Sequence, residues 1–176
     1  MNVFIGCSSK ESLNHIYIES TTTLANYLST HNYDLMCGGT DGLMKILVNT
    51  FKKNNRTINL SGVKGYFSIE SENENVTIYN TVSERKHSLI HSAHLMLFLP
   101  GGLGTMDEIF TAIESKRAKE HNIPIIIINI NHYYDNLINQ LNTMYQENFA
   151  TAIDNQYYHI TNSIEETIQY IEGREK

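Results

Sequence analysis

The chain has 176 residues, of which 41% are hydrophobic and 18% are charged, and its net charge at pH 7 is -6. This length suits one compact domain with a sizeable core, so we expect a single domain over residues 1–176. The acidic balance argues against nucleic acid or an anionic membrane as the main partner. No apolar run approaches the roughly 20 residues of a bilayer-spanning helix, and residues 1–7 lack the basic start of a signal peptide.

Two cysteines, Cys7 and Cys37, each stand at the end of a predicted strand. Two cysteines do not make a disulfide framework. We therefore expect buried free thiols and a cytoplasmic protein.

Apolar runs alternate with helical patterns along the whole chain. Strands are predicted over residues 3–7, 33–37, 58–63, 76–79, 95–99, 124–130 and 157–160. Helices are predicted over residues 11–29, 43–51, 83–93 and 133–146 and from residues 104 and 164, with a surface loop over 70–75. Such alternation predicts an α/β fold, a doubly wound parallel sheet whose ligands lie beyond the carboxyl ends of the strands.

Two glycine turns follow predicted strands, at residues 38–42 (GGTDG) and 101–105 (GGLGT). Each alone is weak evidence for a ligand, because glycine is the default residue of tight turns. Neither fits the dinucleotide fingerprint, since Asp107 occupies the third glycine position after Gly102 and Gly104. No glycine loop is followed by Lys-Ser or Lys-Thr. NAD binding and P-loop chemistry are therefore disfavoured.

The second turn combines a strand, glycines and a helix N-terminus, the backbone geometry that binds anions. Upstream, the Arg85 guanidinium could form two parallel hydrogen bonds to a phosphate or carboxylate. The Lys86 ammonium could pair with such a group as a point charge. Glu108 lies one turn into the helix. Glu108 and its neighbour Asp107 could also be acids that merely favour the helix dipole, and residues 84–86 could be a solvated helix start. Together these residues predict an enzyme acting on a phosphorylated small molecule.

His87, His91 and His94 fall on one face of a predicted helix. That spacing could ligate a metal, but no nearby carboxylate or thiolate completes a ligand set. We expect a packed or solvated face and no metal.

Residues 84–86 (ERK) and 100–108 (PGGLGTMDE) together resemble the LOG (Lonely Guy) family, the cytokinin riboside 5'-monophosphate phosphoribohydrolases and their bacterial relatives, often misnamed lysine decarboxylases. The resemblance runs nearly end to end. Residues 4–9 resemble the first strand and serine turn of the family, 38–44 its other glycine turn, and 131–137 the start of its late helix.

The resemblance implies a Rossmann-like fold without NAD or another cofactor. It implies hydrolysis of the N-glycosidic bond of a nucleoside 5'-monophosphate, AMP or cytokinin-type, by a homodimer with shared active sites. Arg85 and Glu108 match the catalytic pair of the family. The implied substrate- and phosphate-binding residues are Lys86, Gly101, Gly102, Gly104, Thr105, Gly38, Gly39 and Ser8. Oxocarbenium-like chemistry at a sugar needs a carboxylate and an activated water, which suits Glu108.

Two stretches depart from plant-type members, residues 114–117 (ESKR) and 64–66 (KGY). Both are expected around the base pocket, so the resemblance leaves the base open. An alternative is a nucleotide-binding module of the same fold that lacks turnover. A pyridoxal-phosphate lysine decarboxylase is disfavoured, because no lysine stands out as a Schiff-base residue. The dimer seam is expected along the helices after the two motifs, where Ile109, Phe110 and Ile113 form a stripe that could equally be core.

Overall fold

The computed structural model describes residues 1–65, 75–151 and 156–174. The strands are β1 (Asn2–Gly6), β2 (Asp34–Cys37), β3 (Ile58–Val63), β4 (Asn75–Tyr79), β5 (Leu95–Phe98), β6 (Ile125–Ile128) and β7 (His159–Thr161). The helices are α1 (His15–Thr30), α2 (Leu43–Lys53), α3 (Val82–Ser92), α4 (Leu103–Arg117), α5 (Asp135–Gln146) and α6 (Ile164–Arg174). The expected surface loop lies outside the described residues, except for Asn75, which begins β4.

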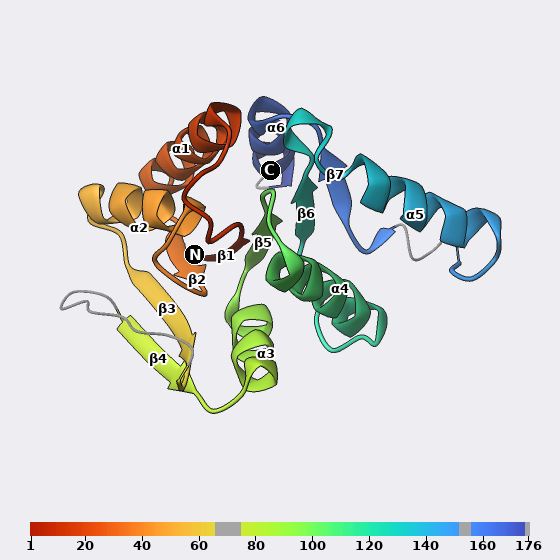
Figure 1. Cartoon of the computed structure of the whole chain (residues 1–176), viewed down its shortest axis with the longest axis horizontal. Coiled ribbons are helices and arrows are strands. Elements are labelled where there is room, and N and C mark those ends of the chain that lie inside the picture. Colours follow the sequence, from red (N-terminus) through yellow and green to blue (C-terminus); the bar gives the residue numbers. More distant parts are fainter. Residues whose placement is uncertain (66–74, 152–155, 175–176) are drawn as a thin grey trace.

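The seven strands form one parallel sheet in the order β4-β3-β2-β1-β5-β6-β7 (Figure 1). Helices α1, α2 and α6 contribute to the hydrophobic core on one face, and α3, α4 and α5 to the core on the other. Successive strand residues alternate between the two cores, so Val3 and Ile5 of β1 belong to one and Phe4 to the other. Strands covered on both faces explain the almost wholly apolar β6. The predicted doubly wound α/β fold is confirmed.

The order of the strands reverses between β1 and β5, which are neighbours in the sheet but 92 residues apart at the pair Val3 and Leu95. Connections from these two strands leave toward opposite sides, which opens a crevice at their carboxyl ends. The sheet therefore places both glycine turns and the loop after β1 around one point.

Several predicted boundaries move by one to four residues, and three of these shifts follow from local structure. Helix α1 begins at His15 because the side chain of Asn14 caps it by accepting a hydrogen bond from the Ile16 amide. Strand β6 ends at Ile128, and the 3-10 turn η1 (Ile130–His132) follows instead of more strand. Helix α5 consequently starts at Asp135 rather than two residues earlier.

Cys7 and Cys37 are free, buried thiols, as predicted. Burial raises the pKa of Cys37 to about 12 and also raises that of Cys7. Both thiols therefore stay protonated and unreactive at neutral pH. None of the helices in the described ranges is long and apolar enough to cross a membrane.

The predicted histidine row divides in the structure. The rings of His87 and His91 stack with centroids 4.0 Å apart, and His91 lies 3.8 Å from Glu120. His94 instead accepts a hydrogen bond from the Asn2 amide at the start of β1. Among the residues that the structure describes, no three His, Cys, Asp or Glu side chains are arranged to hold a metal ion. His87 and His94 are exposed and His91 is half-buried, so the row is largely a solvated face, one of the two expected alternatives.

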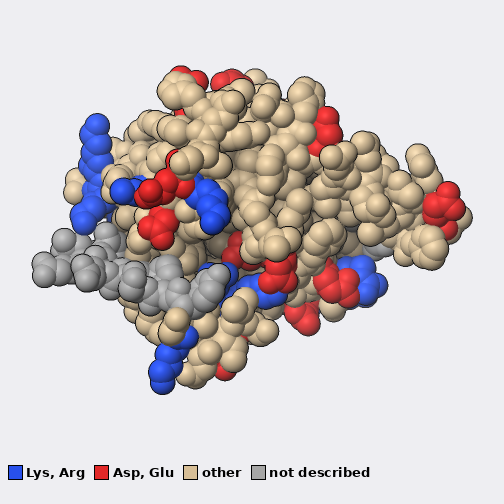
Figure 2. Space-filling model, in the orientation of Figure 1, with Lys and Arg blue, Asp and Glu red and all other residues tan. Residues whose placement is uncertain are grey.

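Acidic and basic side chains are interspersed over the face seen in Figure 2. The described part of that face therefore carries no continuous basic surface of the kind that nucleic acid requires.

Candidate functional site

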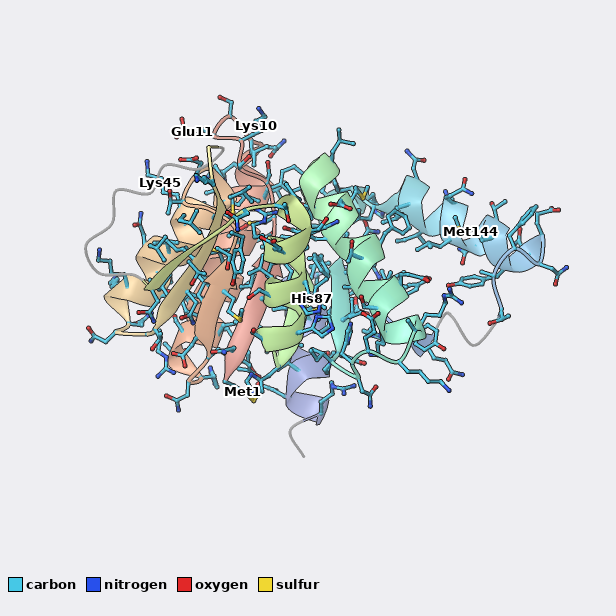
Figure 3. The ribbon with its side chains drawn as sticks, turned by 90° about the horizontal axis from the view of Figure 1, so that it is seen from below. Met1, Lys10, Glu11, Lys45, His87 and Met144 are labelled. Atoms are coloured by element: carbon cyan, nitrogen blue, oxygen red, sulfur yellow. The ribbon has the colours of Figure 1, made fainter. Side chains whose placement is uncertain are left out.

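A pocket of about 420 Å³ opens at the carboxyl ends of β1, β2, β3 and β5. It is lined by Ile5, Gly6, Cys7, Ser8, Ser9, Lys10, Gly38, Gly39, Asp41, Met44, Val63, Arg85, Gly102, Leu103, Gly104, Thr105 and Glu108. In Figure 3, Lys10 and Glu11, which follow β1, lie near Lys45 at one edge of the view, and Met1, which precedes β1, lies at the opposite edge. The pocket thus occupies the crevice where the strand order reverses.

A buried ion pair joins the two central side chains of the pocket. Arg85 Nη2 donates to Glu108 Oε1 at 3.0 Å, and the two side chains are only 17% and 9% exposed. Glycines make room for this pair. A Cβ on Gly38 would lie 2.8 Å from Arg85 Nη1, and one on Gly6 would lie 3.0 Å from Glu108 Oε2. A larger residue at position 38 would therefore displace the Arg85 guanidinium, and one at position 6 would first meet the Phe98 ring at 2.6 Å.

Burial also changes the acidity of Glu108. It raises the pKa of Glu108 to about 7, and the neighbouring Asp107 adds to the rise, whereas Arg85 and Lys86 oppose it. A carboxyl group with this pKa exchanges its proton near neutral pH, as a general acid or base must. On Arg85, Nε is buried without a hydrogen-bond partner among the described residues. The guanidinium therefore keeps one donor free.

The glycine turn after β5 leads into the N-terminus of α4. Thr105 is buried, and its Oγ1 lies so close to Gly101 that a Cβ on this glycine would clash with it. A Cβ on Gly102 or Gly104 would meet nothing within 4 Å. Gly102, Leu103, Gly104 and Thr105 line the pocket at the N-terminus of α4, whose first amide groups have no partners within the helix and attract anions.

The loop after β1 connects the two glycine turns. Ser8 donates its amide hydrogen to the Pro100 carbonyl at 3.2 Å and accepts one from Leu43 at 3.0 Å. The Ser8 side chain accepts a hydrogen bond from the Lys10 amide. Gly42 lies against this loop with φ of 56°, and a Cβ there would be 2.5 Å from the Lys10 carbonyl oxygen. Only glycine fits this left-handed position.

Most of the predicted site residues line the pocket, but two do not. Lys86 Nζ lies 2.7 and 2.6 Å from the two carboxylate oxygens of Asp107 and 3.2 Å from Thr111 Oγ1, so it links α3 to α4. Gly101 is absent from the pocket lining, and its carbonyl accepts a hydrogen bond from the Tyr133 hydroxyl. Glu84 closes a capping box with Thr81 at the start of α3, which makes it a structural residue.

Sequence reasoning missed several lining residues, among them Lys10, Asp41, Met44 and Val63. Lys10 and Asp41 follow β1 and β2 within four residues of each strand end, which is a usable signal for a polar site residue. Met44 and Val63 carried no such signal, because an apolar residue at those places is usually core.

A glycine turn at a helix N-terminus beside a buried carboxylate, at the crevice of a parallel sheet, is typical of a Rossmann-like α/β protein. A family profile described as possible lysine decarboxylase matches residues 68–171, more than half of the chain. The chain belongs to this family, the LOG family.

Two relatives have the same activity in their names. The chain is 26% identical over 155 residues to the cytokinin riboside 5'-monophosphate phosphoribohydrolase LOG2 of Arabidopsis thaliana, covering 85% of this chain and 72% of the relative. It is 26% identical over 156 residues to the probable cytokinin riboside 5'-monophosphate phosphoribohydrolase LOG4 of Oryza sativa subsp. japonica, covering 85% and 67%.

Solved structures share the fold at lower identity. The molybdenum cofactor carrier protein of Chlamydomonas reinhardtii superposes with a TM-score of 0.73 at 15% identity, covering 98% of this chain and 96% of that one. The molybdenum cofactor binding protein of Rippkaea orientalis superposes with a TM-score of 0.68 at 16% identity, covering 99% and 96%. These likenesses establish the Rossmann-like architecture.

Proposed function

We propose that the protein hydrolyses the N-glycosidic bond of a nucleoside 5'-monophosphate to free base and ribose 5-phosphate. The buried pair of Arg85 and Glu108 carries this proposal, because it places a carboxyl group with a pKa near 7 beside an anion-binding turn. The names of the relatives support the same reaction.

The 5'-phosphate binds to the amide groups at Gly102, Gly104 and Thr105, where open space and the N-terminus of α4 favour negative charge. Ser8 supports the turn from the loop after β1. Lys86 acts indirectly, since its bond to Asp107 fixes α3 against α4.

The ribose then lies over Glu108, one helical turn beyond the phosphate. When the bond from C1' to the base nitrogen breaks, the base leaves with the electron pair and an oxocarbenium-like sugar remains; the base becomes neutral by gaining the proton that the attacking water gives up. The ionised form of Glu108 stabilises this positive charge and accepts a proton from the water that attacks C1'. Arg85 holds the carboxylate in place, and its buried Nε, which has no hydrogen-bond partner among the described residues, is a further donor available to the substrate.

The base occupies the end of the pocket formed by β2 and β3. Gly38 and Gly39 leave room for a flat ring, Met44 and Val63 offer apolar contact, and Asp41 offers a hydrogen-bond acceptor. Residues 114–117, expected around the base, are absent from the pocket lining; there, Arg117 pairs with Glu114 at 2.6 Å on the last turn of α4. The pocket accepts AMP or a cytokinin-type nucleotide.

We also propose a homodimer that shares its active sites. Exposed apolar side chains occur on β4, α3 and α4: Val76, Ile78, Val82, Leu103 and Phe110. Leu103 lines the pocket and is 91% exposed, as a side chain covered by a second subunit would be. Of the predicted stripe, Ile109 is core and Phe110 is 43% exposed.

A panel of nucleoside monophosphates, assayed by chromatography for released base, tests the function. We expect at least one nucleotide to be hydrolysed by the wild type and none by Glu108→Gln, while the affinity of the variant for nucleotide stays within about tenfold. Glu114→Gln is the matched control, because Glu114 is an exposed acid of the same helix that pairs with Arg117 outside the pocket. Wild-type turnover by Glu108→Gln would reduce Glu108 to a helix-dipole acid.

The alternative is a module that binds nucleotide without turnover. It predicts a tightly bound nucleotide that survives purification and no release of base from any member of the panel. Pyridoxal phosphate fits the pocket poorly, since Lys10, the only lysine among its described lining residues, is exposed on a loop rather than buried as a Schiff-base lysine would be.

A further inference from the structure

Two adjacent tyrosines contact the glycine turn from the side opposite the pocket. Tyr133 donates its hydroxyl hydrogen to the Gly101 carbonyl at 2.5 Å, and Tyr134 donates its own to the Leu99 carbonyl at 2.8 Å. Their rings meet edge to face with centroids 4.9 Å apart. Neither tyrosine lines the pocket, and the reaction proposed above does not use them.

The turn is thereby held at three successive carbonyls. The carbonyl of Pro100, between Leu99 and Gly101, accepts its hydrogen bond from the Ser8 amide. Each carbonyl oxygen from Leu99 to Gly101, just before the proposed phosphate site, thus has a donor, and two of the three donors are tyrosine hydroxyls.

The peptide unit between Gly101 and Gly102 is the one that matters for anion binding. In a trans peptide the C=O and the following N–H point in opposite directions. Because the Gly101 carbonyl points toward Tyr133, the Gly102 amide hydrogen points away from Tyr133, toward the pocket that Gly102 lines.

This peptide unit is also the easiest of the turn to rotate, since glycines flank it on both sides. A rotation by half a turn would replace the amide hydrogen with a carbonyl oxygen, which repels a phosphate. The hydroxyl of Tyr133 opposes that rotation by holding the carbonyl on the far side.

The chain adopts an unusual conformation to bring the tyrosines there. Asn131 and His132 have φ values of 52° and 59°, which residues other than glycine adopt uncommonly. The side chain of Asn129 accepts a hydrogen bond from the Tyr134 amide at 2.6 Å and so closes this turn. Tyr134 is fully buried, which gives the pair of rings a rigid base. Such conformations are concentrated at functional sites.

We propose that Tyr133 is a positioning residue for phosphate recognition, which keeps the Gly102 amide aimed at the 5'-phosphate, while Tyr134 anchors the strand end below it. The inference rests on the proposed function in so far as it needs a substrate with a phosphate. It assigns to residues outside the pocket the preorganisation of the anion site.

Tyr133→Phe tests this, because it removes one hydroxyl and keeps the ring. For the nucleotide that the wild type hydrolyses, we expect KM to rise about tenfold with kcat changed less than about threefold, as for the loss of one hydrogen bond to a charged group. The rate with the corresponding nucleoside, which has no phosphate, should not change. Isothermal titration with ribose 5-phosphate should show a matching loss of affinity of about tenfold without requiring turnover.

Tyr145→Phe is the matched control. Tyr145 also belongs to the α5 region, and its hydroxyl lies 2.8 Å from that of Tyr158, away from the turn. This variant should bind ribose 5-phosphate as the wild type does, and both variants should keep the wild-type Tm within about 2 °C.

Unchanged KM and unchanged affinity of Tyr133→Phe for ribose 5-phosphate would overturn the inference. So would an equal loss for nucleotide and nucleoside, or a loss shared with Tyr145→Phe, which would make the hydroxyl merely structural. If the wild type hydrolyses no nucleotide, the proposed function fails but the titration still decides the role of Tyr133. A wild type that binds no ribose 5-phosphate would refute the anion site and the inference with it.

Discussion

Glu108→Gln should change how the stability of this protein depends on pH. The Glu108 side chain is almost fully buried, and burial raises its pKa from the ordinary value of 4.5 to about 7. The folded protein therefore binds this proton more tightly than the unfolded chain does. The resulting stabilisation is fully present below about pH 4.5 and is lost as the pH rises through about 7.

The change in pKa corresponds to roughly 3 kcal/mol in the free energy of unfolding. For a domain of this size, each kcal/mol shifts Tm by about 2–4 °C, so the effect amounts to roughly 6–12 °C. Glutamine does not titrate and resembles the protonated acid. The variant therefore keeps at high pH the stabilisation that the wild type loses. We expect similar Tm values near pH 4.5 and a variant that is more stable than the wild type by roughly 6–12 °C at pH 8.

Thermal unfolding followed by circular dichroism between pH 4.5 and 8 measures this difference. All other titrating groups are common to the two proteins, so their contributions cancel to first order. Glu114→Gln provides the control, because Glu114 is an exposed acid of the same helix whose ion pair with Arg117 lies outside the pocket. A difference in Tm that stays constant with pH, or that moves in favour of the wild type as the pH rises, would refute the assignment of a raised pKa.

Three further predictions concern substrate, assembly and backbone strain. Nucleoside monophosphates should be cleaved with a kcat/KM about tenfold or more above that of the matching nucleosides, because the turn at Gly102 orients the phosphate; equal rates for AMP and adenosine would contradict this. Light scattering at micromolar concentration should show a dimer, and Phe110→Glu should dissociate it, since an isologous contact would place both copies of this exposed ring near the two-fold axis; a fully active wild-type monomer would refute the shared site. His132→Gly should raise the free energy of unfolding by about 0.5–1 kcal/mol in urea titrations, because glycine adopts a φ of 59° without strain. A destabilised variant would mean that the His132 imidazole contributes more to stability than its exposed contact with Asp135 suggests.

Local patterns in the sequence were enough to predict the order of strands and helices and the parallel sheet. Apolar runs, glycine turns and helical spacing depend on neighbouring residues, and each type of element leaves its own period in the chain. The same patterns placed Arg85 and Glu108 at one edge of the sheet, because an αβ unit returns the chain to the edge from which it left. Cys7 and Cys37 were correctly predicted as buried thiols for the same reason, since each ends an interior strand.

Contacts between distant segments were decided only by the tertiary structure. Lys86 has the charge of a phosphate ligand, yet Asp107, 21 residues away, holds it outside the pocket. From its position near the start of a helix, Glu108 could be an acid that merely favours the helix dipole. Only its burial in the folded protein raises its pKa to about 7. Tyr133 reaches Gly101, 32 residues earlier, because of a left-handed turn that no local preference predicts. Burial and ion pairing depend on what surrounds a side chain, and packing brings those surroundings together from parts of the chain that carry no signal of one another.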